Sequence, residues 1–220
     1  MELNADFTQQ AIVHGAFISW QPSPIPGVER RMLDRIGDEV ARATTIVRYA
    51  PGSQFSPHTH GGGEEFLVLE GVFQDEHGDY PVGTYVRNPP TSRHTPSSEL
   101  GCVILVKLWQ FDPDDRIQIA IDTNKQTYFS DLMRPGVSRM LLFSDDRETV
   151  GLEYWDATAE IDLWVTDGLE IFVIEGSFWE RNQEFQRYSW LRLPAGSRFS
   201  ARSGTEGCQV WLKQGKFRTF

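Results

Sequence analysis

The sequence has few of the features that mark secreted, membrane-spanning or disulfide-rich proteins. It contains two cysteines, Cys102 and Cys208, so neither a disulfide framework nor a thiolate zinc site is expected. No run approaches the roughly 18 consecutive apolar residues that a transmembrane helix needs. The N-terminus also lacks the basic and apolar regions of a signal peptide. We therefore expect a cytoplasmic protein that does not enter the membrane.

Positive charge is also scarce. The chain carries 21 basic and 31 acidic residues, which gives a formal net charge of −10. A surface of this sign repels phosphate backbones, so no nucleic acid is expected as a partner. Histidine is rare as well, with five in the chain, so the positions of these five matter.

Short strand-like runs, by contrast, are abundant. Aromatic and β-branched residues gather between Gly, Pro, Asn and Asp at residues 44–49, 65–69, 84–87, 103–109, 171–174, 190–193 and 209–213. This pattern predicts an all-β sandwich or barrel. Helical periodicity is weak, and its best candidates are residues 29–36 and 128–133.

Two segments of the chain repeat at a constant spacing. GEEFLVLEGVF (63–73) matches GLEIFVIEGSF (168–178), and TYVRNPPTSRH (84–94) matches SWLRLPAGSRF (189–199). The offset is 105 residues in both cases, since 168 − 63 and 189 − 84 are equal. We predict two copies of one β module. The interruption FDPDDR (111–116) suggests a boundary between domains at 1–112 and 113–220.

Four residues of the first copy have the spacing of a metal site. His58 and His60 are two apart, so on a strand both side chains point to the same face. Glu64 follows a turn of three glycines, and His94 follows the turn at residues 88–91. Three imidazoles and one carboxylate suit a borderline divalent ion such as zinc, iron, manganese, nickel or copper. Four ligands would leave two positions of an octahedral ion open.

The same residues resemble the first sequence motif of the cupin family, which is G-(five)-H-x-H-(three or four)-E-(six)-G. Gly52, His58, His60, Glu64 and Gly71 match it with the correct gaps. The resemblance implies a metal site made of the two histidines, the glutamate and His94. It also implies a bicupin, with two tandem double-stranded β-helix (jelly-roll) barrels.

The second cupin motif, G-(five)-P-x-G-(two)-H-(three)-N, is matched less completely. Gly83, Pro89 and His94 fit, whereas Thr91 replaces a glycine and Ser98 replaces the asparagine. These departures affect the geometry of the turn and leave the number of ligands unchanged.

A narrower resemblance is to the ChrR-like cupins, the C-terminal domains of ChrR-type anti-sigma factors. It rests on residues 62–94, on the EL-GC-VILVK pattern at 99–107 and on the stretch that begins at Trp20. In those proteins an N-terminal helical zinc module clamps a sigma factor, and the cupin binds zinc and conveys a singlet-oxygen or peroxide signal. The ligand set of that N-terminal module is absent here, and strand-like residues begin near residue 11.

Some alternatives stay open at this point. Glu65 could replace Glu64 as the ligand, because cupins allow either gap. His77 is expected in a solvated hairpin turn, and His14 in a structural role. The two cysteines occupy equivalent positions in the two copies, where they are either small buried residues or a redox pair.

The second copy is expected to lack a metal. When the four candidate ligands are carried forward by 105 residues, they fall on apolar residues: Leu163, Val165, Leu169 and Phe199. An emptied polar site would leave a costly hole, so apolar filling is the physically sensible replacement. We expect one divalent ion per chain. Zinc is the preferred metal, and iron, manganese and nickel are alternatives.

Two functions follow as hypotheses. The first is a regulatory or oxidative-stress-sensing module with a protein partner, such as a sigma-factor system. The second is a mononuclear metal-dependent dioxygenase or isomerase that acts on a small oxygenated molecule. A weaker third reading is a carbohydrate or small-ligand binder without catalysis. A homodimer is compatible with all three hypotheses.

Overall fold

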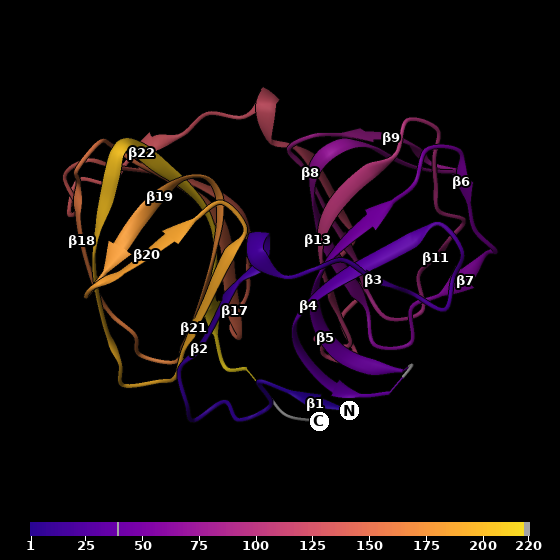
Figure 1. Cartoon of the computed structure of the whole chain (residues 1–220), viewed down its shortest axis with the longest axis horizontal. Coiled ribbons are helices and arrows are strands. Elements are labelled where there is room, and N and C mark those ends of the chain that lie inside the picture. Colours follow the sequence, from indigo (N-terminus) through magenta and orange to yellow (C-terminus); the bar gives the residue numbers. More distant parts are fainter. Residues whose placement is uncertain (39, 218–220) are drawn as a thin grey trace. The chain divides into compact units, whose positions relative to one another are not determined.

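The computed structural model describes residues 1–38 and 40–217, which form two compact units. The first barrel consists of Met1–Ala5 and Ser19–Lys125, and the second of Asp6–Ile18 and the chain from Gln126 onward. Figure 1 shows the strands of each unit wrapped into a barrel. The helices in the described ranges are two short 3-10 turns, η1 (Gly15–Phe17) and η2 (Thr123–Lys125). Neither is long enough to cross a membrane.

The first barrel is built around an antiparallel sheet in the order β1-β4-β5-β13-β8-β10-β14. These strands are β1 (Glu2–Leu3), β4 (Val28–Gly37), β5 (Ala41–Tyr49), β13 (Cys102–Leu108), β8 (Glu64–Asp75), β10 (Thr84–Asn88) and β14 (Ile119–Asp122). The shorter strands are β3 (Gln21–Pro22), β6 (Ser53–Gln54), β7 (His58–Thr59), β9 (Gly78–Pro81), β11 (Arg93–His94) and β12 (Ser97–Ser98). Strand β8 pairs with β13 and β10 and, near its other end, with β9 and β12, so it links both walls of the barrel.

The second barrel repeats this plan in the order β15-β16-β17-β22-β19-β21-β2. These strands are β15 (Phe129–Ser130), β16 (Val137–Ser144), β17 (Glu148–Trp155), β22 (Arg198–Gly215), β19 (Gly168–Glu180), β21 (Ser189–Leu193) and β2 (Ala11–His14). Strand β18 (Glu160–Trp164) pairs with β22, and β20 (Gln183–Gln186) pairs with β19. Aliphatic and aromatic side chains fill the interior, with Phe178 and Phe185 stacked at a ring separation of 4.6 Å.

The all-β prediction is confirmed, and the two helical candidates were wrong. Residues 29–36 lie within β4, which pairs with β5 over most of its length. Residues 128–133 contain β15 and the turn that follows it. Local periodicity was a weak signal in both segments, and pairing with neighbouring strands determined the outcome.

One glycine in each barrel shows why the repeated motif needs this residue. Gly71 and Gly176 have φ values of +69° and +73°, a region that favours glycine. A Cβ atom at Gly71 would lie 2.0 Å from the carbonyl oxygen of Gly101, and one at Gly176 would lie 2.2 Å from that of Gly207. Both close approaches occur beside β-bulges in β8 and β19. The same backbone device is therefore present in both copies.

The strand that precedes each copy joins the sheet of the other copy. Strand β14 follows the predicted boundary at residue 112 but pairs with β10 of the first barrel. Strand β2 lies near the N-terminus but pairs with β21 of the second barrel, beside which Figure 1 draws it in indigo. The units therefore divide the chain differently from the single boundary of the sequence prediction.

Candidate metal centre

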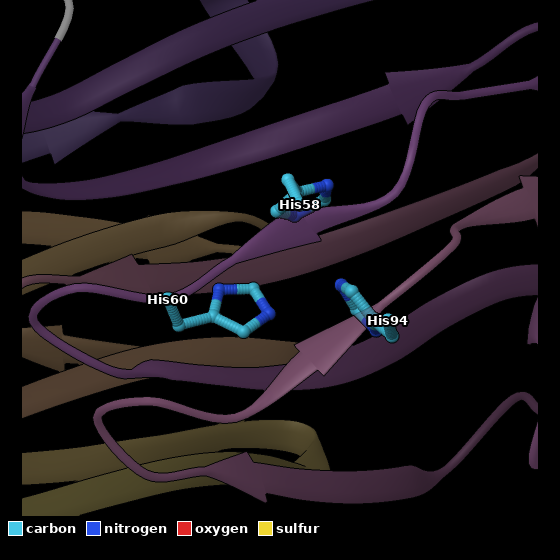
Figure 2. Close-up of side chains that lie close together, drawn as sticks. All are labelled: His58, His60 and His94. Carbon is cyan, nitrogen blue, oxygen red and sulfur yellow. The ribbon is translucent and has the colours of Figure 1, made fainter.

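Three histidines of the first barrel gather around one point. His58 in β7 and His94 in β11 are direct cross-strand partners, and His60 follows β7. Their ring centroids lie 4.7 to 5.0 Å apart, and one potential ligand nitrogen of each lies within 4.8 Å of the others. Figure 2 shows the rings of His60 and His94 turned toward each other, with His58 beside them. This cluster could hold a metal ion.

Glu64 supplies a carboxylate at the same place. Its Oε2 lies 3.6 Å from Nε2 of His60 and 3.5 Å from Nε2 of His94. Asn88 donates a hydrogen bond to this oxygen at 3.3 Å, and the Glu64 side chain is buried. The alternative ligand Glu65 follows Glu64 directly in β8, so its side chain points to the opposite face of the sheet. The structure thus brings the four predicted residues together and favours Glu64 over Glu65.

The outer nitrogens of two rings are held by neighbouring groups. Nδ1 of His94 lies 3.2 Å from Oδ2 of Asp75, and Nδ1 of His58 lies 3.3 Å from the carbonyl oxygen of Ser56. Such contacts fix the ring orientation and leave Nε2 free for a metal, as is usual for metal-ligating histidines. The sequence prediction missed Asp75. The only signal was its place in a hairpin turn, where an aspartate is common for other reasons.

The Nε2 atoms of the buried histidines show whether a metal ion would fit between the rings. Nε2 of His60 and Nε2 of His94 are buried and have no hydrogen-bond partner among the described residues. Buried polar atoms normally have a partner, so these two nitrogens fit an ion bound between them. Nitrogen donors with one carboxylate also match the chemistry of borderline divalent metals.

The two buried imidazoles respond in opposite ways to their surroundings. Burial lowers the pKa of His60. Burial also acts on His94, but the hydrogen bond that its ring donates to Asp75 and the charge of Glu64 outweigh it and raise the pKa of His94. A metal would need the unprotonated Nε2 of His94, so its binding would compete with protonation of this ring.

The remaining two histidines lie outside this cluster. His77 is exposed in the turn between β8 and β9. His14 is in β2 of the second barrel, where its Nδ1 lies 3.1 Å from Oγ of Ser189 and its Nε2 lies 2.7 Å from Nε2 of Gln183.

The corresponding place in the second barrel is packed with apolar side chains. Leu163 and Phe199 are direct cross-strand partners, just as His58 and His94 are in the first barrel. Val165, Leu169 and Phe199 are buried in the core, and Leu163 packs against it. The strand pairing therefore places residues that are 105 positions apart at equivalent points of the two barrels. At this point the second barrel has a hydrophobic core where the first has its histidines.

Comparison with known proteins agrees with this geometry. The family described as ChrR Cupin-like domain matches residues 8–112, which contain all four candidate ligands. These residues, which make up most of the first barrel, therefore match a cupin family. No curated protein sequence matches it.

Solved structures extend the cupin likeness to the whole chain. A candidate dioxygenase from Nostoc punctiforme superposes with a TM-score of 0.79 and 14% identity, covering 96% of this chain and 84% of its own. Bacterial pirin from Escherichia coli, solved in complex with nickel(II), has a TM-score of 0.67 and 12% identity, covering 94% and 100%. Oxalate decarboxylase from Lactobacillus farciminis has a TM-score of 0.66 and 9% identity, covering 94% and 86%. Identities this low establish the bicupin fold alone.

The departure from the cupin motif at Thr91 has a structural cost. Thr91 has a φ of +75°, and the equivalent Gly196 of the second barrel has a φ of +78°. The N–H of each donates to the carbonyl of the residue at the His60 position, which is Val165 in the second barrel. The turn is therefore the same in both barrels, but in the first it holds a β-branched residue in a conformation that favours glycine.

We expect Thr91→Gly to stabilise the protein by about 1 kcal/mol. Relief of the left-handed strain, of order 1–3 kcal/mol, should exceed the roughly 0.5–1 kcal/mol that glycine costs through the unfolded chain. Urea unfolding of the two proteins measures the difference. Thr91→Ala should gain less, because alanine retains a Cβ. A glycine variant less stable than the parent would contradict this account.

The two cysteines are buried, which bears on their chemistry. Burial raises the pKa of the Cys102 thiol to about 11 and that of Cys208 to about 12. At pH 8 both are expected to be thiols, so neither should react with a disulfide reagent in the native cupin, while both should react in denaturant. The measurement is the time course of thiol labelling. Rapid labelling of the native protein at pH 8 would instead revive a redox role.

Proposed function

We propose that the first barrel holds one divalent ion through His58, His60, Glu64 and His94 and uses it as a mononuclear metal enzyme. The observation that carries the proposal is the pair of buried, unpartnered Nε2 atoms facing Glu64. A bound divalent ion supplies Lewis acidity and open positions for a chelating oxygenated molecule. Zinc remains the first expectation, with iron, manganese and nickel as alternatives.

The surrounding side chains favour a ligand with an apolar body. Phe73 lies 5.7 Å from the His94 ring and 5.8 Å from the Tyr49 ring, centroid to centroid. Phe55 packs edge-on against Tyr49 at 5.0 Å. These rings form an apolar wall beside His94, and burial raises the pKa of Tyr49, which keeps its hydroxyl protonated.

Arg30 offers a positive charge on the interior face of β4. Its cross-strand partner Val47 belongs to the buried interior core, so the two side chains start on the same face of the sheet. The Nε atom of Arg30 is buried and has no hydrogen-bond partner among the described residues. Because an unsatisfied buried donor is costly, a ligand that accepts its hydrogen bond is favoured. We therefore include a carboxylate on the proposed small molecule.

The proposal is tested by loading the protein separately with iron, manganese, nickel and zinc. Each form is offered diketones, enediols and catechols, in neutral and carboxylated versions, and oxygen uptake and products are measured. Turnover should disappear in His60→Ala. Arg30→Met should raise KM for the carboxylated compounds while the metal content stays the same. Retention of zinc alone, without oxygen uptake or isomerisation of any compound, would count against an enzyme.

A second candidate is an oxidant-sensing regulatory module, which the match to the ChrR Cupin-like domain favours. With both thiols buried, we place the response to oxidant at the metal centre. We propose exposure of the metal-loaded protein to organic hydroperoxide or singlet oxygen, followed by metal analysis and limited proteolysis. Unchanged metal content and an unchanged cleavage pattern would rule out this role. In this second proposal the partner is a protein, such as a component of a sigma-factor system.

A further inference from the structure

Trp109 lies against the turn that connects two of the candidate ligands. Its indole is so close to the backbone of residues 61–62 that a Cβ atom at Gly62 would come within 2.4 Å of Cδ2, and one at Gly61 within 2.9 Å of Cζ2. The backbone N–H of Trp109 also donates to the carbonyl of Gly63 at 3.1 Å. The loop between His60 and Glu64 is therefore packed directly beneath this indole.

The conformation of Trp109 is unusual for its residue type. Its φ is +59°, in the left-handed region where a bulky side chain is strained. The side chain is also 41% exposed, so burial of the indole offers only partial compensation. Strained residues persist where the surrounding structure requires them, and they cluster at functional sites. In this conformation the indole contacts the diglycine turn between His60 and Glu64.

The second barrel serves as an internal comparison for this contact. Trp109 corresponds to Gly215, which is the register partner of Gly168, the equivalent of Gly63. The two glycines beneath the indole correspond to Thr166 and Asp167. An open hollow lies at this place in the second barrel, and Thr166, Asp167 and Gly215 are among the residues that line it.

A neighbouring contact behaves differently. A Cβ atom at Gly63 would lie 2.4 Å from the Phe111 ring, and one at Gly168 would lie 2.4 Å from the Phe217 ring. This glycine–phenylalanine contact is present in both barrels, so it belongs to the architecture of the module. The contact of Trp109 with Gly61 and Gly62 is found in the barrel that has the histidine cluster, whereas the equivalent of Trp109 in the other barrel is Gly215, which has no side chain to make it.

We infer that Trp109 is a positioning residue of the metal centre, which clamps the diglycine turn so that His60 and Glu64 face the bound ion together. The inference rests on the proposed metal site. The clamp acts through the backbone: the indole presses on the turn, and the turn sets the distance between the two ligand side chains. Residues that orient metal ligands typically change affinity by 10–100-fold when removed.

The test uses the full chain loaded with Co²⁺, whose visible spectrum reports ligand geometry. Trp109→Ala is expected to release Co²⁺ to a chelator about 10-fold faster than the parent and to show a shifted spectrum. Trp109→Phe, which keeps a flat ring, should restore most of both properties. Trp164→Ala, at a site 66% exposed in the second barrel, is the matched control and should change neither.

A double-mutant cycle isolates the contact itself. Gly62 has no positive φ, so Gly62→Ala should disturb the turn only by its clash with the indole. Alone it should speed release as Trp109→Ala does, whereas in the Trp109→Ala background it should add nothing. Gly62→Ala also keeps the inference testable if Trp109→Ala does not fold.

The outcomes separate the inference from the proposed function. If the parent protein binds Co²⁺ tightly and Trp109→Ala shows the same release rate and spectrum, the clamp is refuted and the metal site stands. Additive effects of the two substitutions would also refute it, because they would act independently. If the parent binds no divalent ion, the proposed function fails and the clamp fails with it.

Discussion

Protein purified without added metal is expected to contain about one divalent ion per chain, and the His58→Ala, His60→Ala double variant almost none. The variant removes two of the three imidazoles and leaves His94 and Glu64, which are too few to compete with water for the ion. Elemental analysis by mass spectrometry measures the ratio and also identifies the metal.

The matched control for this experiment is His77→Ala. His77 is also a histidine of the first barrel, but it is exposed in a turn outside the cluster. Its loss should leave the metal content unchanged. Equal metal in the parent and the double variant would show that the histidine cluster is not the site and would remove the basis of the proposed function. An ion ratio near two would instead point to a second site outside the histidine cluster.

The sequence identified the candidate ligands because their spacing is local. Two histidines on one strand face and a glutamate after a flexible turn are placed by backbone geometry within a few residues. His94 lies farther along the chain, after the turn at residues 88–91, and its pairing with His58 in β11 and β7 accounts for its proximity. Asp75 and Trp109 could not be predicted in this way. Their contacts join residues that are far apart in the sequence and form only when the barrel closes. A local sequence pattern therefore does not predict them.

The repeat predicted two barrels but not which strand completes each of them. An offset of 105 residues aligns β8 with β19 and β10 with β21, and these strands indeed occupy equivalent positions. The repeat does not specify where the strand before each copy goes. Strands β2 and β14 each pair with a strand of the other copy, because that is where the open edges of β21 and β10 accept backbone hydrogen bonds. Edge pairing of this kind leaves no trace in residue spacing.

The placement of β2 makes an N-terminal residue part of the stability of the C-terminal barrel. Ile12 is the cross-strand partner of Leu191 and packs against the core of the second barrel. Nearby, Arg192 stacks over the Phe7 ring at 3.9 Å and donates to the carbonyl of Asp6 at 3.2 Å. Residues 6–14 are thus held by the second barrel through both backbone and side chains.

We therefore expect Ile12→Asp to lower the free energy of unfolding of the second barrel by roughly 2–4 kcal/mol, because it places an unpaired carboxylate against an apolar core. Tryptophan fluorescence during urea unfolding reports mainly this barrel, which holds five of the seven tryptophans, including the buried Trp155, Trp190 and Trp211. The metal content of the first barrel should not change, since no candidate ligand contacts β2 in the described pairings.

The control is Ile25→Asp, at a residue that is 52% exposed in the first barrel, and it should stay within about 0.5 kcal/mol of the parent. If Ile12→Asp unfolds at the same urea concentration as the parent, β2 contributes nothing to the second barrel in solution. If instead it loses the metal while the tryptophan transition is unchanged, the strand supports the first barrel, and a single boundary near residue 112 describes the chain better than the exchanged arrangement does.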